Sequence, residues 1–202
     1  MRVVSEIITV VNQNHASDFS NIEFVFLDRD GVLNRKPAPG DYVTRVEDFV
    51  MLPGVEDAIA ALNRCGRKAI VVTNQRGIAL GLYSQAELDR IHGKLKAELA
   101  AHGAHLDGIY VCPHDAGQCD CRKPLTGLFE QAFRDFPDAR PERCMMVGDS
   151  LRDVEAGVRL GMVTAFVIGD DQPTAEEERA AMLSQIKVKS LPQLVDRYLC
   201  VT

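Results

Sequence analysis

Short apolar segments recur along the chain, and each one ends in polar or glycine residues. The first is Phe24–Leu27, which is followed at once by Asp28. Four more have the same form: "KAIVVTN" at 68–74, "GIYVC" at 108–112, "CMMVGD" at 144–149 and "TAFVIG" at 164–169. Continuous apolar runs of this length, rich in β-branched and aromatic residues, are typical of buried strands. We therefore predict five strands.

Segments with a helical pattern separate these predicted strands. Helices are predicted within residues 54–66, 84–103, 125–136 and 150–161, and the acidic stretch 170–180 leads into a late one. Ser84 and Glu87 have the spacing of a capping box, while Gly66 and Gly103 suit helix C-termini. Alternating strands and helices predict an α/β fold: a doubly wound, mostly parallel sheet with helices on both faces.

Length and composition indicate one globular domain. The 202 residues are enough for a sizeable core, and we take residues 21–202 as the domain and residues 1–20 as an extension of unknown role. A net charge of -6 argues against a nucleic-acid surface. No stretch approaches the roughly 20 apolar residues of a membrane helix. We therefore expect no nucleic-acid or membrane partner, and a monomer.

Cysteine usage favours a metal site over a disulfide framework. The N-terminal segment "MRVVSEIITVV" is not expected to be a signal peptide because Glu6 interrupts its apolar run, so we expect a cytoplasmic location and reduced thiols. Three of the six cysteines lie with a histidine in "CPHDAGQCDC", residues 112–121. The others, Cys65, Cys144 and Cys200, are expected to be small buried apolar side chains.

The first motif with chemical potential is "FLDRDGVLN", residues 26–34. Asp28 and Asp30 come directly after a predicted buried strand. One interpretation is an Asx-rich turn in which Gly31 supplies an unusual backbone angle. However, two close carboxylates at the end of a buried strand need a countercharge, and a divalent cation would supply it. One carboxylate would then be a nucleophile and the other a proton carrier.

Polar residues at two other points suit phosphate. Thr73 and Asn74 end the second predicted strand, where a hydroxyl and an amide match phosphate oxygens. Arg122 and Lys123 would balance a phosphate dianion, although a solvated surface pair explains them equally well.

The motif "VGDSLRDV" supplies further carboxylates. Asp149 ends the fourth predicted strand and would complete a site for Mg²⁺, which takes one or two carboxylates together with water and phosphate. Asp153 lies at a predicted helix start, where an N-capping role is sufficient to explain it.

In this order, the four motifs resemble those of the haloacid dehalogenase superfamily of aspartate-nucleophile phosphatases. The resemblance covers roughly residues 23–166. The added pattern "CPH…CxCRKP" looks like the branch that contains D-glycero-D-manno-heptose-1,7-bisphosphate 7-phosphatases and the histidinol-phosphatase domain. In that branch the cysteines and the histidine bind zinc in a loop that replaces a large cap domain.

The resemblance implies a zinc loop at residues 112–124. Its four ligands would be Cys112, His114, Cys119 and Cys121. Four such ligands leave no coordination position open, so we expect a structural zinc rather than a redox or disulfide site. Fixing the loop would place Arg122 and Lys123 beside the phosphate. Only four residues separate His114 from Cys119, fewer than in many heptose members, which would reduce substrate contacts from this loop.

The mechanism implied by the resemblance is phosphoryl transfer in two steps. Asp28 attacks phosphorus and forms an aspartyl-phosphate, while Asp30 protonates the leaving group and then activates water. Mg²⁺ would be held by Asp28, the backbone carbonyl of Asp30, and Asp149. Charge on the phosphoryl oxygens would be stabilised by Thr73, Asn74 and Lys123.

The expected substrate is a small phosphorylated sugar. The segments "TNQRGIALGLYS" and "PGDYV" look more like the heptose-bisphosphate enzymes than the histidinol type. On that resemblance, the sugar or its second phosphate would be contacted by Asn74, Gln75, Arg76 and Arg122. Ser150 departs from the pattern, because some heptose members carry a lysine there. The alternatives are a histidinol-phosphate or other sugar-phosphate phosphatase and a zinc-stabilised binding module; the complete set of catalytic residues disfavours the module.

Overall fold

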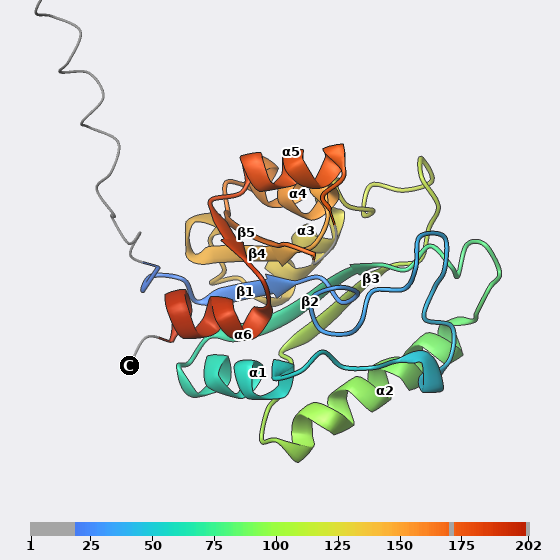
Figure 1. The fold of residues 1–202 in the computed structure, drawn as a ribbon, viewed down its shortest axis with the longest axis horizontal. Coiled ribbons are helices and arrows are strands. Elements are labelled where there is room, and N and C mark those ends of the chain that lie inside the picture. Colours follow the sequence, from blue (N-terminus) through green and yellow to red (C-terminus); the bar gives the residue numbers. More distant parts are fainter. Residues whose placement is uncertain (1–18, 170–171, 201–202) are drawn as a thin grey trace, which may run out of the picture.

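A central sheet lies between two layers of helices in the computed structural model of the protein (Figure 1). The structure describes residues 19–169 and 172–200. The expected N-terminal extension, residues 1–20, therefore lies almost entirely outside the described residues. Phe19 is the first described residue, and it packs edge-to-face on Tyr198 with 5.9 Å between ring centroids. The described chain therefore already contributes to the core before the first strand.

The sheet has six strands, and every pair of neighbours is parallel. In chain order they are β1 (Phe24–Leu27), β2 (Lys68–Asn74), β3 (Gly108–Cys112), β4 (Cys144–Gly148), β5 (Val163–Val167) and β6 (Ile186–Val188). Their spatial order is β3-β2-β1-β4-β5-β6. The five predicted strands are confirmed. The sixth was not predicted, because three residues are too few to show a strand pattern.

The helices follow the predicted alternation. They are α1 (Val55–Arg64), α2 (Gln85–Ala101), α3 (Gly127–Asp135), α4 (Leu151–Leu160), α5 (Ala175–Leu183) and α6 (Leu191–Leu194), with short helical turns η1 (Val46–Asp48), η2 (Pro141–Arg143) and η3 (Val195–Leu199). Ser84 caps α2, since its Oγ accepts from the Glu87 N–H at 3.1 Å. The Glu87 carboxylate instead pairs with Arg90 at 2.7 Å, so the side-chain half of the predicted capping box is not formed.

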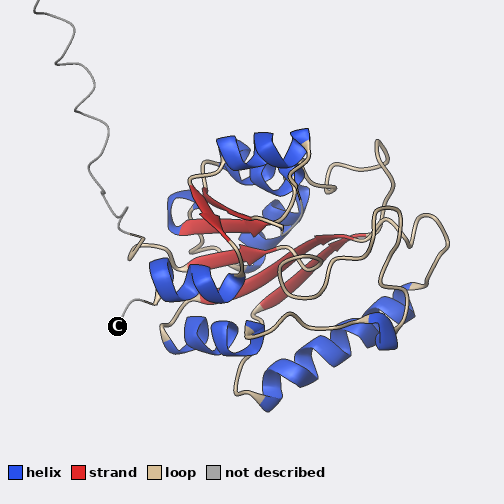
Figure 2. Ribbon diagram, in the orientation of Figure 1, coloured by secondary structure: helices blue, strands red, loops and turns tan. Residues whose placement is uncertain are grey.

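Side chains of the strands alternate between two separate apolar layers. Val25 and Leu27 pack in the layer that contains α1, α2 and α6, whereas Phe24 and Phe26 pack in the layer that contains α3 and α4. A third small cluster joins α4 and α5 to β5. Helices therefore cover both faces of the sheet (Figure 2), and the predicted doubly wound α/β fold is confirmed.

Long connections follow the carboxyl ends of β1, β2 and β3, at residues 28–54, 75–84 and 113–126. Within the described residues these connections hold only turns, bridges and η1, and not a folded cap. The second and third are joined by main-chain bonds from Gln75 N to the Cys112 carbonyl at 2.8 Å and from Ala79 N to the Pro113 carbonyl at 3.1 Å. No helix in the described ranges is both long and apolar enough to cross a bilayer.

The cysteines outside the zinc-loop motif differ in environment. Cys144 is fully buried, as expected. The expectation was wrong for Cys65 and Cys200, which are joined as a disulfide with 6.3 Å between their Cα atoms. Cys65 ends α1 and Cys200 ends η3, two elements that pack together in the same layer. Their separation of 135 residues leaves no local pattern from which this pairing could be predicted.

Candidate active site

Three carboxylates meet at the carboxyl edge of the sheet. Asp28 follows β1, Asp149 follows β4, and Asp153 lies in the first turn of α4. Since β1 and β4 are adjacent parallel strands, their ends lie side by side, and oxygens of all three side chains are within 4.8 Å of one another. The sequence analysis explained Asp153 by capping alone. Its Oδ2 does accept from the Ser150 N–H at 3.1 Å, but its Oδ1 faces Lys123.

Gly31 makes this convergence possible. A Cβ built on residue 31 would lie 2.0 Å from Oδ2 of Asp149, and the backbone φ of +88° is also one that side-chain-bearing residues rarely adopt. The glycine after the two aspartates is therefore required both by the turn and by the close approach of the carboxylate from β4.

Lys123 lies between two of the carboxylates. Its side chain is buried, and its Nζ is 2.9 Å from Asp28, 2.6 Å from Asp153 and 2.7 Å from the Val72 carbonyl. Asn74 fixes the Lys123 main chain, because its Oδ1 accepts from the Lys123 N–H at 3.0 Å and its Nδ2 donates to the Lys123 carbonyl at 3.2 Å. The amide that was expected to bind phosphate thus holds the lysine that faces Asp28.

Burial dominates the electrostatics of this cluster. It raises the pKa of Asp28 to about 7, against the opposing effect of Lys123, and raises the pKa of Asp149 to about 6, with Asp153 adding to the shift. Burial also disfavours the charged form of Lys123, but Asp153 and Asp28 outweigh it and raise the Lys123 pKa. Lys36 reaches Asp149 at 2.8 Å from the connection after β1. The carboxylates carry more negative charge than the buried lysine neutralises.

The cluster fits a hard divalent cation. Mg²⁺ prefers carboxylate oxygens, and Asp28, Asp149 and Asp153 supply them. Oδ1 of Asp153 is buried and, although close to Lys123, makes no well-directed hydrogen bond within the described part of the chain, so it retains acceptor capacity. Asp30, whose backbone carbonyl was expected to bind Mg²⁺, is not part of this group of three carboxylates.

Asp30 is held by a separate set of donors. The Arg29 Nη2 lies 2.9 Å from both of its oxygens, the Asn34 amide donates to Oδ1 at 2.9 Å and the Gln75 amide donates to Oδ2 at 3.2 Å. Arg29 is fully buried, and its Nη1 lies 3.5 Å from Nε2 of His92 in α2. Burial, reinforced by Arg29, lowers the pKa of His92 to about 4, so this imidazole is neutral at pH 7.

The sequence analysis missed Arg29 and His92 as parts of the site. Neither residue was assigned a functional role from its sequence context. The buried position of Arg29 at the end of a strand is the one signal that could have indicated a paired charge.

The remaining predicted substrate residues contact the zinc-loop segment. Arg76 forms an ion pair with Asp115 at 2.6 Å, and the Arg122 Nη1 donates to the His114 carbonyl at 3.3 Å. Both arginines are partly exposed beside the site, so the loop after β2 and the loop after β3 carry cations along a shared edge.

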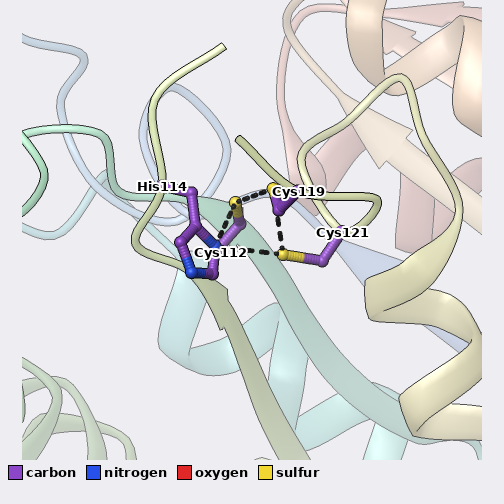
Figure 3. A group of neighbouring side chains, drawn as sticks. All are labelled: Cys112, His114, Cys119 and Cys121. Carbon is purple, nitrogen blue, oxygen red and sulfur yellow. Dashed lines mark hydrogen bonds between the residues drawn. The ribbon is translucent and has the colours of Figure 1, made fainter. Parts of the chain in front are cut away.

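The side chains of the CPH…CxC motif form one cluster (Figure 3). Neighbouring sulfur atoms are 3.4 and 3.6 Å apart, and the His114 Nδ1 is 3.5 and 3.8 Å from two of them. The ligands are Cys112, His114, Cys119 and Cys121. A tetrahedral zinc with Zn–S of about 2.3 Å and Zn–N of about 2.0 Å has ligand–ligand edges of roughly 3.5–3.8 Å. The cluster therefore has the dimensions of a closed Cys₃His zinc site.

A cavity of about 570 Å³ adjoins the carboxylates. Gly31, Lys36 and Asp149 line it on one side, and the ends of β5 and α5 line the opposite side. A second cavity of about 610 Å³ lies over the connection after β1 and shares Arg35 and Lys36 with the first. Both cavities are large enough for a phosphorylated sugar and carry cations.

Comparison with known proteins identifies the family. A family model described as HAD-hydrolase-like matches residues 120–194. D-glycero-alpha-D-manno-heptose-1,7-bisphosphate 7-phosphatase of Mycobacterium bovis is 45% identical over 132 residues, which are 65% of this chain and 69% of the relative. The beta-heptose 7-phosphatase of Escherichia coli K12 is 34% identical and aligns over 88% of this chain and 95% of its own. The chain belongs to this family of haloacid dehalogenase-like phosphatases.

Solved structures place the fold in the same family. The D,D-heptose 1,7-bisphosphate phosphatase of B. bronchiseptica, complexed with magnesium and phosphate, has a TM-score of 0.76 and 31% identity over 87% of this chain and 97% of its own. The corresponding enzyme of Burkholderia thailandensis has a TM-score of 0.61 and 28% identity, over 86% of this chain and 96% of its own.

Proposed function

We propose that this protein is a Mg²⁺-dependent phosphatase that removes the 7-phosphate of D-glycero-D-manno-heptose 1,7-bisphosphate. The observation that carries the proposal is the convergence of Asp28, Asp149 and Asp153 around Lys123 at the carboxyl edge of the sheet. The substrate follows from the names of relatives that align over nearly their whole length.

Asp28 is the proposed nucleophile. Its Oδ1 lies 2.9 Å from Lys123, which orients the carboxylate and balances part of the charge that an incoming phosphate brings. Attack on phosphorus forms an aspartyl-phosphate as the bond to the sugar oxygen breaks. Mg²⁺ held by Asp28, Asp149 and the Asp30 carbonyl, with Asp153 beside them, would reduce the repulsion between carboxylate and phosphate. Thr73 lies at the end of β2, next to β1, where its hydroxyl suits an equatorial phosphoryl oxygen.

Asp30 is the proposed acid and base. It would give a proton to the departing sugar oxygen and take one from the water that hydrolyses the aspartyl-phosphate. Its place outside the three-carboxylate cluster supports a role in proton transfer rather than in metal binding through its side chain.

The zinc site is proposed to be structural. Four protein ligands fill a tetrahedral coordination sphere, so the zinc has no position for water or substrate. It would hold the loop that ends in Arg122 and Lys123.

The sugar end of the substrate is proposed to meet the cations around the cluster. Arg76 and Arg122 border the zinc loop, while Arg35 and Lys36 line both cavities together with carboxylates, so cationic donors are available to a second phosphate. A monomeric active unit is part of this proposal. We also propose a cytoplasmic location, where such charged sugar phosphates are metabolites.

Phosphate release from a panel of substrates tests this proposal. The panel holds both anomers of the heptose bisphosphate, histidinol phosphate and simple sugar phosphates, each with Mg²⁺ and with a chelator. We expect the highest kcat/KM for a heptose bisphosphate, no turnover without Mg²⁺, and no turnover by Asp28→Asn. Asp57→Asn, an exposed carboxylate on α1, is the control and should be fully active. Preference for histidinol phosphate would overturn the substrate, and turnover by Asp28→Asn would overturn the mechanism.

A further inference from the structure

Gln75 lies one residue beyond β2 and is almost completely buried. Its Nε2 donates to the Thr73 Oγ1 at 2.8 Å and to the Asp30 Oδ2 at 3.2 Å, while its Oε1 accepts from the Tyr83 hydroxyl at 2.6 Å. A glutamine amide has two N–H donors, and both are used here. The side chain therefore faces two proposed catalytic groups and has no donor left for a sugar.

Tyr83 determines which way this amide points. Burial raises the pKa of the Tyr83 phenol to about 12, and its hydroxyl donates to the Gln75 Oε1 at 2.6 Å. A donated hydrogen bond must end on the amide oxygen, which leaves Nε2 facing Thr73 and Asp30. Gly77 makes room for the ring, because a Cβ at that position would lie 2.2 Å from the Tyr83 Cε1.

The contact from Gln75 leaves the Thr73 hydroxyl hydrogen available. A threonine hydroxyl offers one hydrogen and two acceptor positions. Gln75 occupies an acceptor position, and the bond to Gln75 is the sole side-chain hydrogen bond of Thr73 among residues 19–169 and 172–200. The hydrogen is thus directed away from Gln75, and an incoming phosphoryl oxygen is the acceptor that the proposed reaction supplies.

We propose that Gln75, oriented by Tyr83, is a positioning residue that directs the Thr73 hydroxyl at the phosphoryl group and helps to hold Asp30. This inference rests on the proposed function, because it assumes the roles of Thr73 and Asp30. It replaces the sugar contact that the sequence suggested for Gln75. Most of the effect of Gln75 on the reaction is expected to act through Thr73, because the Gln75–Thr73 hydrogen bond is shorter than the Gln75–Asp30 one. Asp30 is in addition held by Arg29 and Asn34.

A substrate without a sugar separates positioning from substrate contact. In Gln75→Leu, kcat should fall about 10- to 100-fold on both the heptose bisphosphate and p-nitrophenyl phosphate, with little change in KM, because the phosphoryl group is common to both. Gln75→Glu has nearly the same shape but replaces two donors by acceptors, so its loss should be at least as large. A loss confined to the heptose bisphosphate, with KM raised, would overturn the proposal in favour of a sugar contact.

Two further comparisons test the route through Thr73. The double variant Thr73→Val/Gln75→Leu should lose little more activity than Thr73→Val alone, since both changes remove the same directed hydroxyl. Tyr83→Phe should lower kcat on both substrates in the same direction as Gln75→Leu but by less. Its matched control is Tyr110→Phe, which removes a hydroxyl bond of 2.7 Å to Asp135 away from the site and should leave kcat unchanged.

Thermal melts of every variant separate loss of function from loss of fold. If Gln75→Leu is unfolded, Tyr83→Phe keeps the test decisive, because only one oxygen is removed. Full activity of folded Gln75→Leu or additive losses in the double variant would overturn the positioning role while leaving the phosphatase intact. A wild-type protein that is inactive on every substrate would instead overturn the proposed function, and the positioning role with it.

Discussion

At the scale of single residues, the surroundings assign different chemistry to two aspartates of one motif. Asp28 shares its space with Asp149, Asp153 and a buried lysine, so it lies where a cation and a phosphate would meet. Asp30, two residues later, is surrounded by the donors of Arg29, Asn34 and Gln75. Both aspartates lie in the turn that follows β1, and their side chains contact different neighbours there.

A leaving-group comparison tests the acid role of Asp30. Asp30→Asn should lose several orders of magnitude on a sugar phosphate but clearly less on p-nitrophenyl phosphate, whose leaving group needs little protonation. Rates of phosphate release on both substrates measure the difference, with Asp138→Asn, an exposed carboxylate, as control. Equal losses on the two substrates would argue against proton donation.

His92 should make stability depend on pH. The pKa of His92 in the folded protein is about 4, below the ordinary value of 6.5. Between pH 4 and pH 6.5, His92 is therefore protonated in the unfolded chain but neutral in the folded protein. The stability contributed by neutral His92 is therefore present above pH 6.5 and is lost as pH falls toward 4.

Denaturant unfolding at pH 7 and pH 5 measures this effect. Relative to His92→Gln, the wild type should lose on the order of 1–2 kcal/mol over this interval. His102→Gln, at an exposed histidine, should keep the wild-type slope. Parallel curves for wild type and His92→Gln would show that burial does not suppress protonation of His92.

At the scale of elements, the connection between β3 and α3 is organised by four side chains instead of by regular structure. Residues 113–126 contain neither helix nor strand, yet they must place Lys123 within 3 Å of Asp28. The Cys₃His cluster closes one end of this segment, and Asn74 holds the other through two hydrogen bonds to the Lys123 main chain. The loop therefore fixes the position of Lys123 beside Asp28.

Removal of one ligand of the Cys₃His cluster should affect both stability and activity, although the cluster itself is not expected to bind substrate. Cys119→Ser should lower zinc content from about one per chain, lower the melting temperature and reduce kcat/KM, because metal binding is coupled to folding of the loop. The Mg²⁺ requirement should remain unchanged. Metal analysis with thermal melts measures this, and Cys144→Ser, a buried cysteine outside the cluster, should retain zinc. Wild-type protein without zinc would contradict the structural role.

At the scale of the whole molecule, β1 joins the two halves of the sheet and leads directly into Asp28. It pairs with β2 on one side and β4 on the other, so the core and the site depend on the same four residues. Phe26 is fully buried there, 5.4 Å from Phe129 and 5.8 Å from Phe133 between ring centroids.

Truncation of this central ring should be costly. Phe26→Ala should lower the free energy of unfolding by about 3–5 kcal/mol, because it removes buried area and leaves a cavity. Met182→Ala, at an exposed position of α5, should change it by less than about 0.5 kcal/mol. Equilibrium denaturation measures both. Equal effects would mean that Phe26 is not at the centre of the core.

The sequence by itself determined the elements and the chemical inventory. Five strands, the main helices, the aspartate motif and the Cys₃His set are local patterns, because periodicity, glycine ends and ligand spacing act over a few residues. Even Lys123, far from Asp28 along the chain, could be proposed from its place in a recognised motif order.

Only the tertiary structure decided which side chains meet. Arg29 with His92, Gln75 with Asp30, and Cys65 with Cys200 are separated by 63, 45 and 135 residues, and their contacts follow from strand order and helix packing. Asp153 is visible in the sequence as a helix cap, but its second oxygen contacts Lys123 because α4 begins just after β4, the neighbour of β1 in the sheet. Burial, which sets the charge of these groups, is likewise a property of the packed molecule and not of any local stretch.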